Sequence, residues 1–165
     1  MLSVIISRRR ERKKDEYSLP FSYISKQRAG SSARKNIWLL SFLYNQMLND
    51  KIREYEATKK MLRNTPAMYK KAYPFLKEVD YLALANEQMH LEKAYKNFFR
   101  NPKIGFPKSK SKHRSRKSYT TNVVNGNIQV EDHRIKLPKL KWIRMKKHRD
   151  IAEKYCLKSV TISMD

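Results

Sequence analysis

Residues 91–122 read LEKAYKNFFRNPKIGFPKSKSKHRSRKSYTTN, and the chain changes character inside this stretch. Up to Phe99 the apolar residues recur at helical spacing, whereas from Asn101 prolines and cations follow one another with almost no aliphatic residue. From Ser118 onward, short β-branched runs are typical of strands. The stretch therefore predicts a helical part before it and a β-rich part after it.

Two long helices are predicted before the change. Ser31 or Ser32 can cap a helix from about Ala33 to Leu62, and Asp80 can cap a second helix that ends at Phe99. The apolar stripe of the first consists of Ile37, Leu40, Tyr44, Met47 and Leu48, and that of the second of Leu84, Gln88, Leu91, Tyr95 and Phe98. Between them, Pro66 and Pro74 bracket a short link. Packing the two stripes together in an antiparallel pair is the simplest arrangement.

Short strands are predicted after the change, at 118–124, 128–130, 134–137, 142–145 and 157–163. The turn Asn125–Gly126–Asn127 favours a hairpin between the first two strands. We therefore expect an α+β fold: two long antiparallel helices followed by a small curved β-sheet or partial barrel. The expected division is a basic, loose or only partly ordered amino-terminal arm (1–32), a helical lobe (33–100), a basic extended crossing (101–117) and a β segment (118–165).

The charge of the chain points to a polyanionic partner. Its 165 residues include 38 Lys and Arg against 15 Asp and Glu, giving a formal net charge of +23. Residues 100–149 alone hold 16 cations and 2 acids, so more than half of the excess lies in fifty residues. Such an excess is far beyond what solubility requires, and it is typical of proteins that bind nucleic acid.

The crossing contains the first group of candidate binding residues. Cations alternate there with small polar residues, and in an extended chain residues two apart are separated by about 7 Å, close to the repeat of one nucleic-acid strand. We favour phosphate binding over a merely solvated loop, because like charges at this density oppose compaction. The group consists of Lys108, Lys110, Lys112, His113, Arg114, Arg116 and Lys117.

A second candidate group surrounds Trp142. In a strand, Trp142, Arg144 and Lys146 would share one face and Ile143 and Met145 the other. An exposed Trp142 could stack on bases, but burial of Trp142 in the core is an equally good reading of the sequence. The group consists of Lys136, Lys139, Lys141, Trp142, Arg144, Lys146, Lys147 and Arg149.

Other chemistry is not predicted. Tyr95, Phe98, Phe99 and Phe106 have the spacing of a packed core, and the four histidines have no ligand spacing, so neither a metal nor another cofactor is expected. Glu131 and Asp132 favour turn chemistry over catalysis. No catalytic residue is predicted.

The single cysteine, Cys156, cannot form an internal disulfide, and no apolar run approaches the length of a membrane span. The start of the sequence does not have the pattern of a signal peptide. The cytoplasm is the expected compartment.

Residues 44–163 resemble the TnpB (OrfB) proteins of bacterial insertion sequences, which are RNA-guided nucleases. Four segments carry the resemblance: YNQMLNDKIREYE, LEKAYKNFFRNPKIGFPKSKSKHRSRKSYTTN, IKLPKLKWIRMKKHR and KSVTIS. The second and third segments, in this order and at this separation, are its most specific part. The family pattern also begins with a β-strand of the wedge barrel, whereas residues 1–29 are arginine-rich and differ from it.

The resemblance implies a nucleic-acid-binding part of a transposase-associated RNA-guided DNA endonuclease, with guide RNA and DNA as partners and the cations above as its contacts. The family cuts with a later RuvC-like domain, which is not found in this sequence, so we expect a truncated form that binds without cleaving. A nuclease domain encoded separately, or lost, would complete it. The alternatives are a family-derived DNA-binding transcriptional regulator and a ribosomal-type structural RNA-binding protein.

Overall fold

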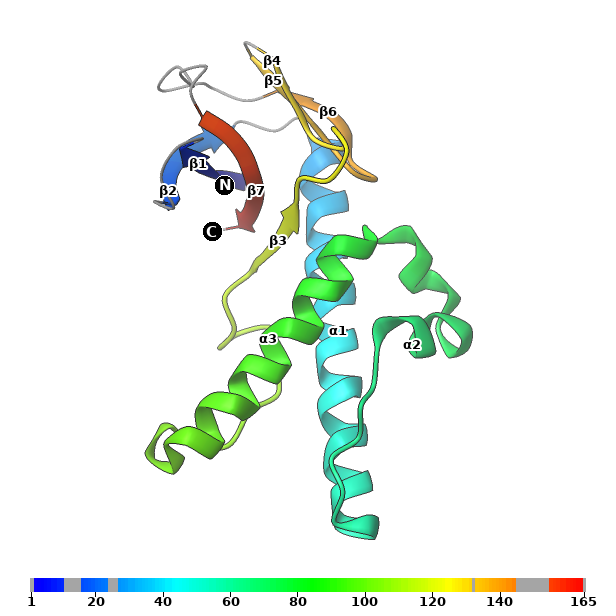
Figure 1. The fold of residues 1–165 in the computed structure, drawn as a ribbon. Helices are drawn as coiled ribbons and strands as arrows, with labels where there is room; N and C mark the ends of the chain where they lie inside the picture. Colours follow the sequence, from blue (N-terminus) through cyan, green and yellow to red (C-terminus); the bar gives the residue numbers. More distant parts are fainter. Residues whose placement is uncertain (1, 11–15, 24–26, 132, 145–154, 165) are drawn as a thin grey trace. The chain divides into compact units, whose positions relative to one another are not determined.

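The computed structural model describes residues 2–10, 16–23, 27–131, 133–144 and 155–164. It confirms a mixed fold of helices and strands, with three α-helices and two small antiparallel sheets, neither of which closes into a barrel in the described residues (Figure 1). The chain divides into two compact units. One contains residues 1–37 and 116–165, and the other contains residues 38–115. No helix in the described part has the length and apolar character needed to cross a membrane.

The first unit contains a four-stranded sheet of order β2-β1-β7-β3, formed by β1 (Leu2–Arg10), β2 (Glu16–Tyr23), β3 (Ser118–Asn122) and β7 (Tyr155–Met164). Every neighbouring pair is antiparallel. One face is the core, because the register aligns Val4 and Tyr119 with Ile162, and Ile6 with Val160, and all five side chains are buried. Alternation of side chains across the strands accounts for this shared face.

The loose arm expected for residues 1–32 is therefore wrong for its described part. Residues 2–10 and 16–23 are strands of this sheet, and β1 pairs with β7 at the far end of the sequence. Val4 and Ile6 provide the alternation of a half-buried strand, which the arginines after them obscured. Pro20 is tolerated because β2 is an edge strand, where a missing N–H breaks no pairing on the outer side.

A second, three-stranded sheet has the order β4-β5-β6 and consists of β4 (Gln129–Glu131), β5 (Arg134–Leu137) and β6 (Lys141–Arg144). The predicted hairpin at Asn125–Asn127 is wrong. The turn itself forms, with φ of 51° at Asn125 and 69° at Gly126 and a hydrogen bond from Asn127 N to Val124 O. Its flanking strands enter different sheets, because β3 finds its partner in β7 and β4 in β5.

The second unit is built on α1 (Gln27–Thr58), which begins in the first unit, and on α3 (Tyr81–Arg100). The link between them forms α2 (Pro66–Ala72) and the 3-10 turn η1 (Pro74–Glu78), and a second turn η2 (Pro102–Ile104) follows α3. Asp80 occupies the N-cap position of α3, as predicted, while α1 starts earlier than the expected Ala33.

Most members of the predicted apolar stripes are in the core of this unit, whereas Gln88 and Phe98 are half-buried. Leu40, Tyr44 and Met47 of α1 are buried, as are Leu84 and Leu91 of α3. The relation of the helices differs from the expected antiparallel pair, because the link returns along α1 and α3 then crosses α1 in the same general direction (Figure 1). Asn64 in that link donates to the Met47 carbonyl at 2.9 Å, which holds the returning chain against α1.

The buried stripe of α3 should dominate the stability of the second unit. Leu91 is fully buried, so Leu91→Ala should lower the free energy of unfolding by about 2 to 5 kcal/mol through lost transfer energy and a residual cavity. Met89 in the same helix is 61% exposed, so Met89→Ala is the matched control and should change stability by less than about 0.5 kcal/mol. Chemical denaturation followed by circular dichroism measures both. Equal effects would contradict the assigned burial.

Candidate nucleic-acid interface

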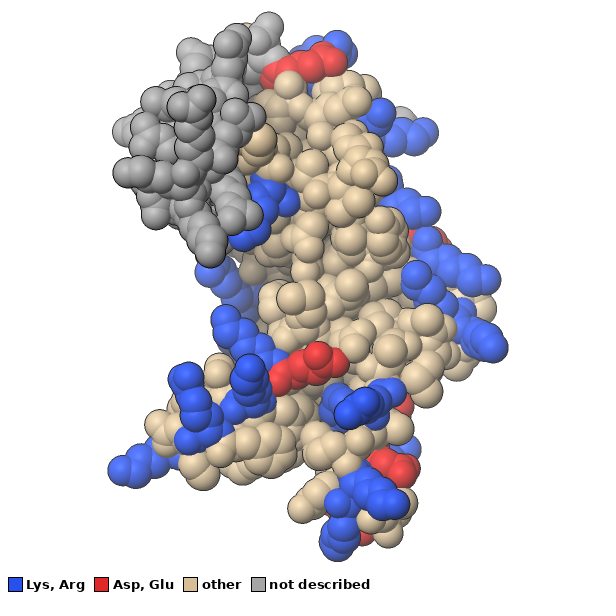
Figure 2. All heavy atoms as spheres, in the orientation of Figure 1, with Lys and Arg blue, Asp and Glu red and all other residues tan. Residues whose placement is uncertain are grey.

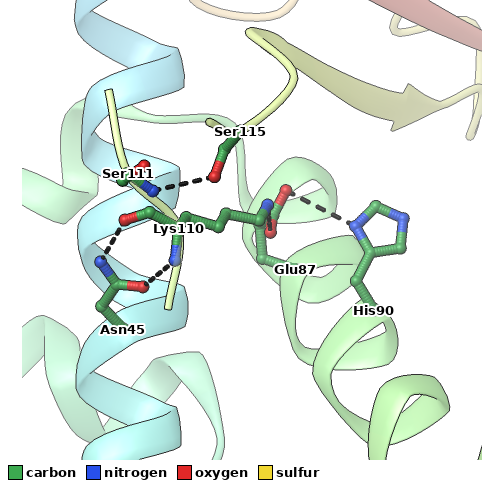
Figure 3. A network of polar contacts seen from close by, with 6 residues as sticks. All are labelled: Asn45, Glu87, His90, Lys110, Ser111 and Ser115. Carbon is green, nitrogen blue, oxygen red and sulfur yellow. Dashed lines mark hydrogen bonds and ion pairs between the residues drawn. The ribbon is translucent and has the colours of Figure 1, made fainter. Parts of the chain in front are cut away.

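A buried carboxylate fastens the crossing to the helices of its own unit (Figure 3). Glu87 of α3 is 1% exposed, and its carboxylate accepts a hydrogen bond from the Lys110 ammonium in the crossing. His90 lies on the other side of the carboxylate, with Nδ1 3.6 Å from Glu87 Oε1. Burial opposes ionisation of Glu87, but His90 and Lys110 outweigh it and lower the pKa of the carboxyl group.

The backbone of Lys110 is held as firmly as its side chain. Asn45 of α1 accepts from Lys110 N at 2.7 Å and donates to Lys110 O at 2.9 Å. The Lys110 ammonium also lies 4.9 Å from the centroid of the Tyr44 ring, within the range of a cation–π contact. One residue of the crossing is thus bound through both backbone groups and its side chain. Lys110 therefore anchors the crossing to the helices, and the Glu87 carboxylate neutralises its charge.

The remaining cations of the crossing are displayed rather than buried. Lys108, Lys112, His113 and Arg114 are exposed in the second unit, and Arg116 and Lys117 are exposed in the first.

The extended course predicted through residue 117 is wrong for residues 111–115, which form a turn. Ser115 N donates to Ser111 O at 3.1 Å, and Ser111 N donates to Ser115 Oγ at 2.8 Å. Short hydroxyl side chains compete for backbone hydrogen bonds in this way. The serines that alternate with the cations therefore favour a turn over an extended chain.

The sheet β4-β5-β6 has one buried and one exposed face. Ile135 and Ile143 lie opposite each other and are 0% and 2% exposed. On the other face, Trp142 lies opposite Lys136, and Arg144 lies opposite Arg134. The predicted alternation around Trp142 is therefore confirmed for the described residues. Trp142 is 40% exposed, so the alternative reading as a buried core residue does not hold.

Arg134 belongs to this face, although the sequence reading did not select it. Its guanidinium carbon lies 4.9 Å from the centroid of the Trp142 ring, and its Nε donates to Glu131 Oε2 at 2.5 Å. Glu131, at the end of β4, thus orients the guanidinium over the indole. The β5–β6 register was the missing information, because it sets Arg134 diagonally next to Trp142.

The connection between β5 and β6 holds two further cations in an unusual backbone conformation. Lys139 and Lys141 have φ of 65° and 60°, in the left-handed region, where a side chain costs roughly 1 to 2 kcal/mol relative to glycine. Leu140 N donates to Leu137 O, and Pro138 takes the second position of this turn. Both lysines are exposed at this end of the sheet, and Lys141, the first residue of β6, lies opposite Leu137.

Several candidates lie outside the described residues, namely Asp132, Met145, Lys146, Lys147, His148 and Arg149. Within the described ranges, no three His, Cys, Asp or Glu side chains gather as a metal site requires. Cys156, the single cysteine of the sequence, is exposed.

Comparison with family models and with curated proteins adds no relative to this description. No family model matches the chain, and no curated protein matches it either. The resemblance to TnpB proteins therefore stays a prediction.

Loss of the Lys110 anchor should destabilise the second unit. Lys110→Met leaves Glu87 buried without its cation, which should cost about 3 to 5 kcal/mol, whereas Glu87→Leu combined with Lys110→Met should recover most of the loss. Lys112→Met is the control, because Lys112 is exposed two residues away. Denaturant titration of the four proteins measures these differences. If the single and double variants are equally unstable, the pair does not act as a unit.

Acid should remove the contribution of Glu87. The pKa of its carboxyl is lowered in the folded state, so its stabilisation is complete above the ordinary value of 4.5 and is lost as pH falls below that value. Between about pH 5 and pH 3, the wild type should therefore lose stability more steeply than Glu87→Gln, which has no proton to bind at this position. Parallel slopes in denaturation experiments across this range would show that Glu87 does not titrate with folding.

Proposed function

We propose that this protein binds nucleic acid, and that the exposed face of the β4-β5-β6 sheet is a principal contact surface. One observation supports this most directly: an exposed tryptophan is surrounded by cations on a sheet face whose reverse side is buried. An apolar indole on a solvent face contributes nothing to the core of its own sheet. An aromatic ring among cations suits bases and phosphates together.

The ring and the cations would contribute different terms to binding. Lys136, Arg144 and the two turn lysines offer charge to phosphates, and each neutralised phosphate releases counterions. The indole of Trp142 and the planar guanidinium of Arg134 can each stack on an unpaired base. Because Glu131 already pairs with Arg134, a phosphate would have to compete for that guanidinium, whereas the stacking plane remains usable.

We propose more specifically a nucleic-acid-binding part of a transposase-associated RNA-guided nuclease, which holds guide RNA and target DNA through backbone charge without cleaving them. The pairing of β1 with β7 supports this, because the TnpB pattern expects an amino-terminal strand in the wedge domain and the first residues do form one. The two basic groups, in residues 108–117 and 136–149, also lie within the segments that carry the resemblance. Transposition and DNA recombination would be the processes served.

Two other functions make different demands. A family-derived transcriptional regulator should prefer one DNA duplex in the absence of RNA, and a ribosomal-type protein should copurify with ribosomal RNA. Sequencing of the nucleic acid that copurifies with the protein, with and without RNase treatment, separates the three. Recovery of a transcript from the end of an insertion sequence is the result that the proposal expects.

Binding should depend steeply on salt and on the sheet face. The logarithm of the affinity should fall with the logarithm of salt concentration by about 0.9 per phosphate neutralised on duplex DNA and about 0.7 on single strands. Lys136→Ala with Arg144→Ala should reduce this slope by between one and two, and Trp142→Leu should cost about 1 to 3 kcal/mol on single strands.

Lys77→Ala is the matched control for charge, because Lys77 is exposed in η1, outside the proposed surface. Fluorescence anisotropy with labelled oligonucleotides at several salt concentrations measures slope and affinity, and circular dichroism checks the fold of each variant. An affinity that does not change with salt would refute the proposed function.

A further inference from the structure

The end of α3 carries a second surface on which cations and exposed rings occur together. Its members, which we call the α3-end surface, share high exposure and a position in the last turns of α3 or just after them: Lys93, Lys96, Phe99, Arg100, Lys103 and Phe106. Lys93, Lys96 and Arg100 follow one another at helical spacing on the side opposite the buried Leu84 and Leu91. Phe99 lies between this row and the buried side, and Phe106 packs from the buried side against Tyr95 and Phe98. Figure 2 shows Lys and Arg atoms gathered around this end, with uncharged atoms and a small acidic patch beside them.

The rings of this surface stand on a packed base. Phe106 contacts Tyr95 and Phe98 edge-on, with centroid distances of 5.5 and 5.4 Å, and Phe99 stacks on Tyr95 at 6.1 Å. Tyr95 is 6% exposed, whereas Phe99 and Phe106 are 63% and 45% exposed. The sequence reading as core packing thus holds for Tyr95 and is wrong for the other two. The exposed rings are fixed in place, so little entropy would be lost when a ligand stacks on them.

Cations dominate the charge from Lys93 onward, and the exposed Glu92 is the acid that precedes them. Residues 93–115 contain eight Lys and Arg and no Asp or Glu. Glu87 neutralises Lys110, so seven cations of this stretch remain without that partner. The field of the helix explains a cation in the last turn, such as Arg100, but its effect does not extend to Lys93, two turns earlier, nor to an exposed phenyl ring.

We propose that the α3-end surface binds single-stranded nucleic acid, with its cations on the phosphates and with Phe99 and Phe106 stacked on unpaired bases. This rests on the proposed function and adds a site in the second unit, separate in sequence from the β4-β5-β6 face. A duplex presents its phosphates to such a surface but keeps its base faces stacked inside. The cations therefore serve both forms of nucleic acid, whereas the rings serve only unpaired bases.

The test uses the full chain and two fluorescein-labelled probes of equal length, an oligodeoxythymidylate strand and a mixed-sequence DNA duplex. Phe99→Leu keeps an apolar side chain at an exposed position and removes the ring. It should weaken single-strand binding by roughly five-fold or more, at the value of one stacked base, and change duplex binding by less than about two-fold. Tyr81→Leu is the control, because Tyr81 is an exposed aromatic residue, 59% accessible, at the other end of α3.

Each outcome bears on one of the two proposals. Unchanged single-strand affinity in both Phe99→Leu and Phe106→Leu, while Lys136→Ala with Arg144→Ala still weakens binding, overturns the α3-end surface and leaves the proposed function standing. Equal losses on strand and duplex overturn the stacking role. If the wild-type chain binds neither probe at low salt, the proposed function fails. Helical content measured by circular dichroism should be the same in all variants.

Discussion

The ion pair between Glu87 and Lys110 is the constraint on which the second unit depends. A carboxylate that is almost completely withdrawn from water must be paired, and its cation comes from the crossing rather than from a neighbouring helix. Asn45 then binds the backbone of the same lysine, so α1, α3 and the crossing meet at one residue. The cations of the crossing repel one another, and the buried Glu87 carboxylate holds this segment against the helices through Lys110.

Burial separates the structural lysine from those available to a ligand. The Lys110 side chain is 24% exposed, whereas Lys108 and Lys112 on either side are exposed. The β4-β5-β6 sheet makes the same separation by strand alternation, with Ile135 and Ile143 on one face and cations around Trp142 on the other. In both units, therefore, the apolar or neutralised members of a basic segment hold the fold, and the other cations of these segments that the structure describes are exposed.

The parts that the sequence predicted correctly depend on short-range patterns, and the parts that it missed depend on distant pairing. The stripes of α1 and α3 and the strand β5 follow from periodicity within a few turns or residues. β1 pairs with β7 at the far end of the sequence as well as with the nearby β2, and the strands on either side of Asn125 separate because each pairs with a different strand. Arg134 became visible only through the register of β5 and β6. At Ser111 and Ser115 the prediction was wrong for a local reason. The charge pattern favoured an extended chain, but hydrogen bonds between these two residues form a turn.

Charge and aromatic exposure carry different information about the ligand. The net charge of +23 accounts for attraction to any polyanion, and it gives no preference between RNA, DNA, strand or duplex. A preference must come from groups that contact the bases, and the two proposed surfaces offer exposed rings for this in different settings. Trp142 lies on a sheet face under a guanidinium, and Phe99 and Phe106 lie at a helix end on a packed ring cluster. Since a ring stacks only on a base whose face is open, both proposed surfaces would favour unpaired segments. Selectivity for single strands would then be a property of these few rings, superimposed on an affinity that the cations supply to nucleic acid of either form.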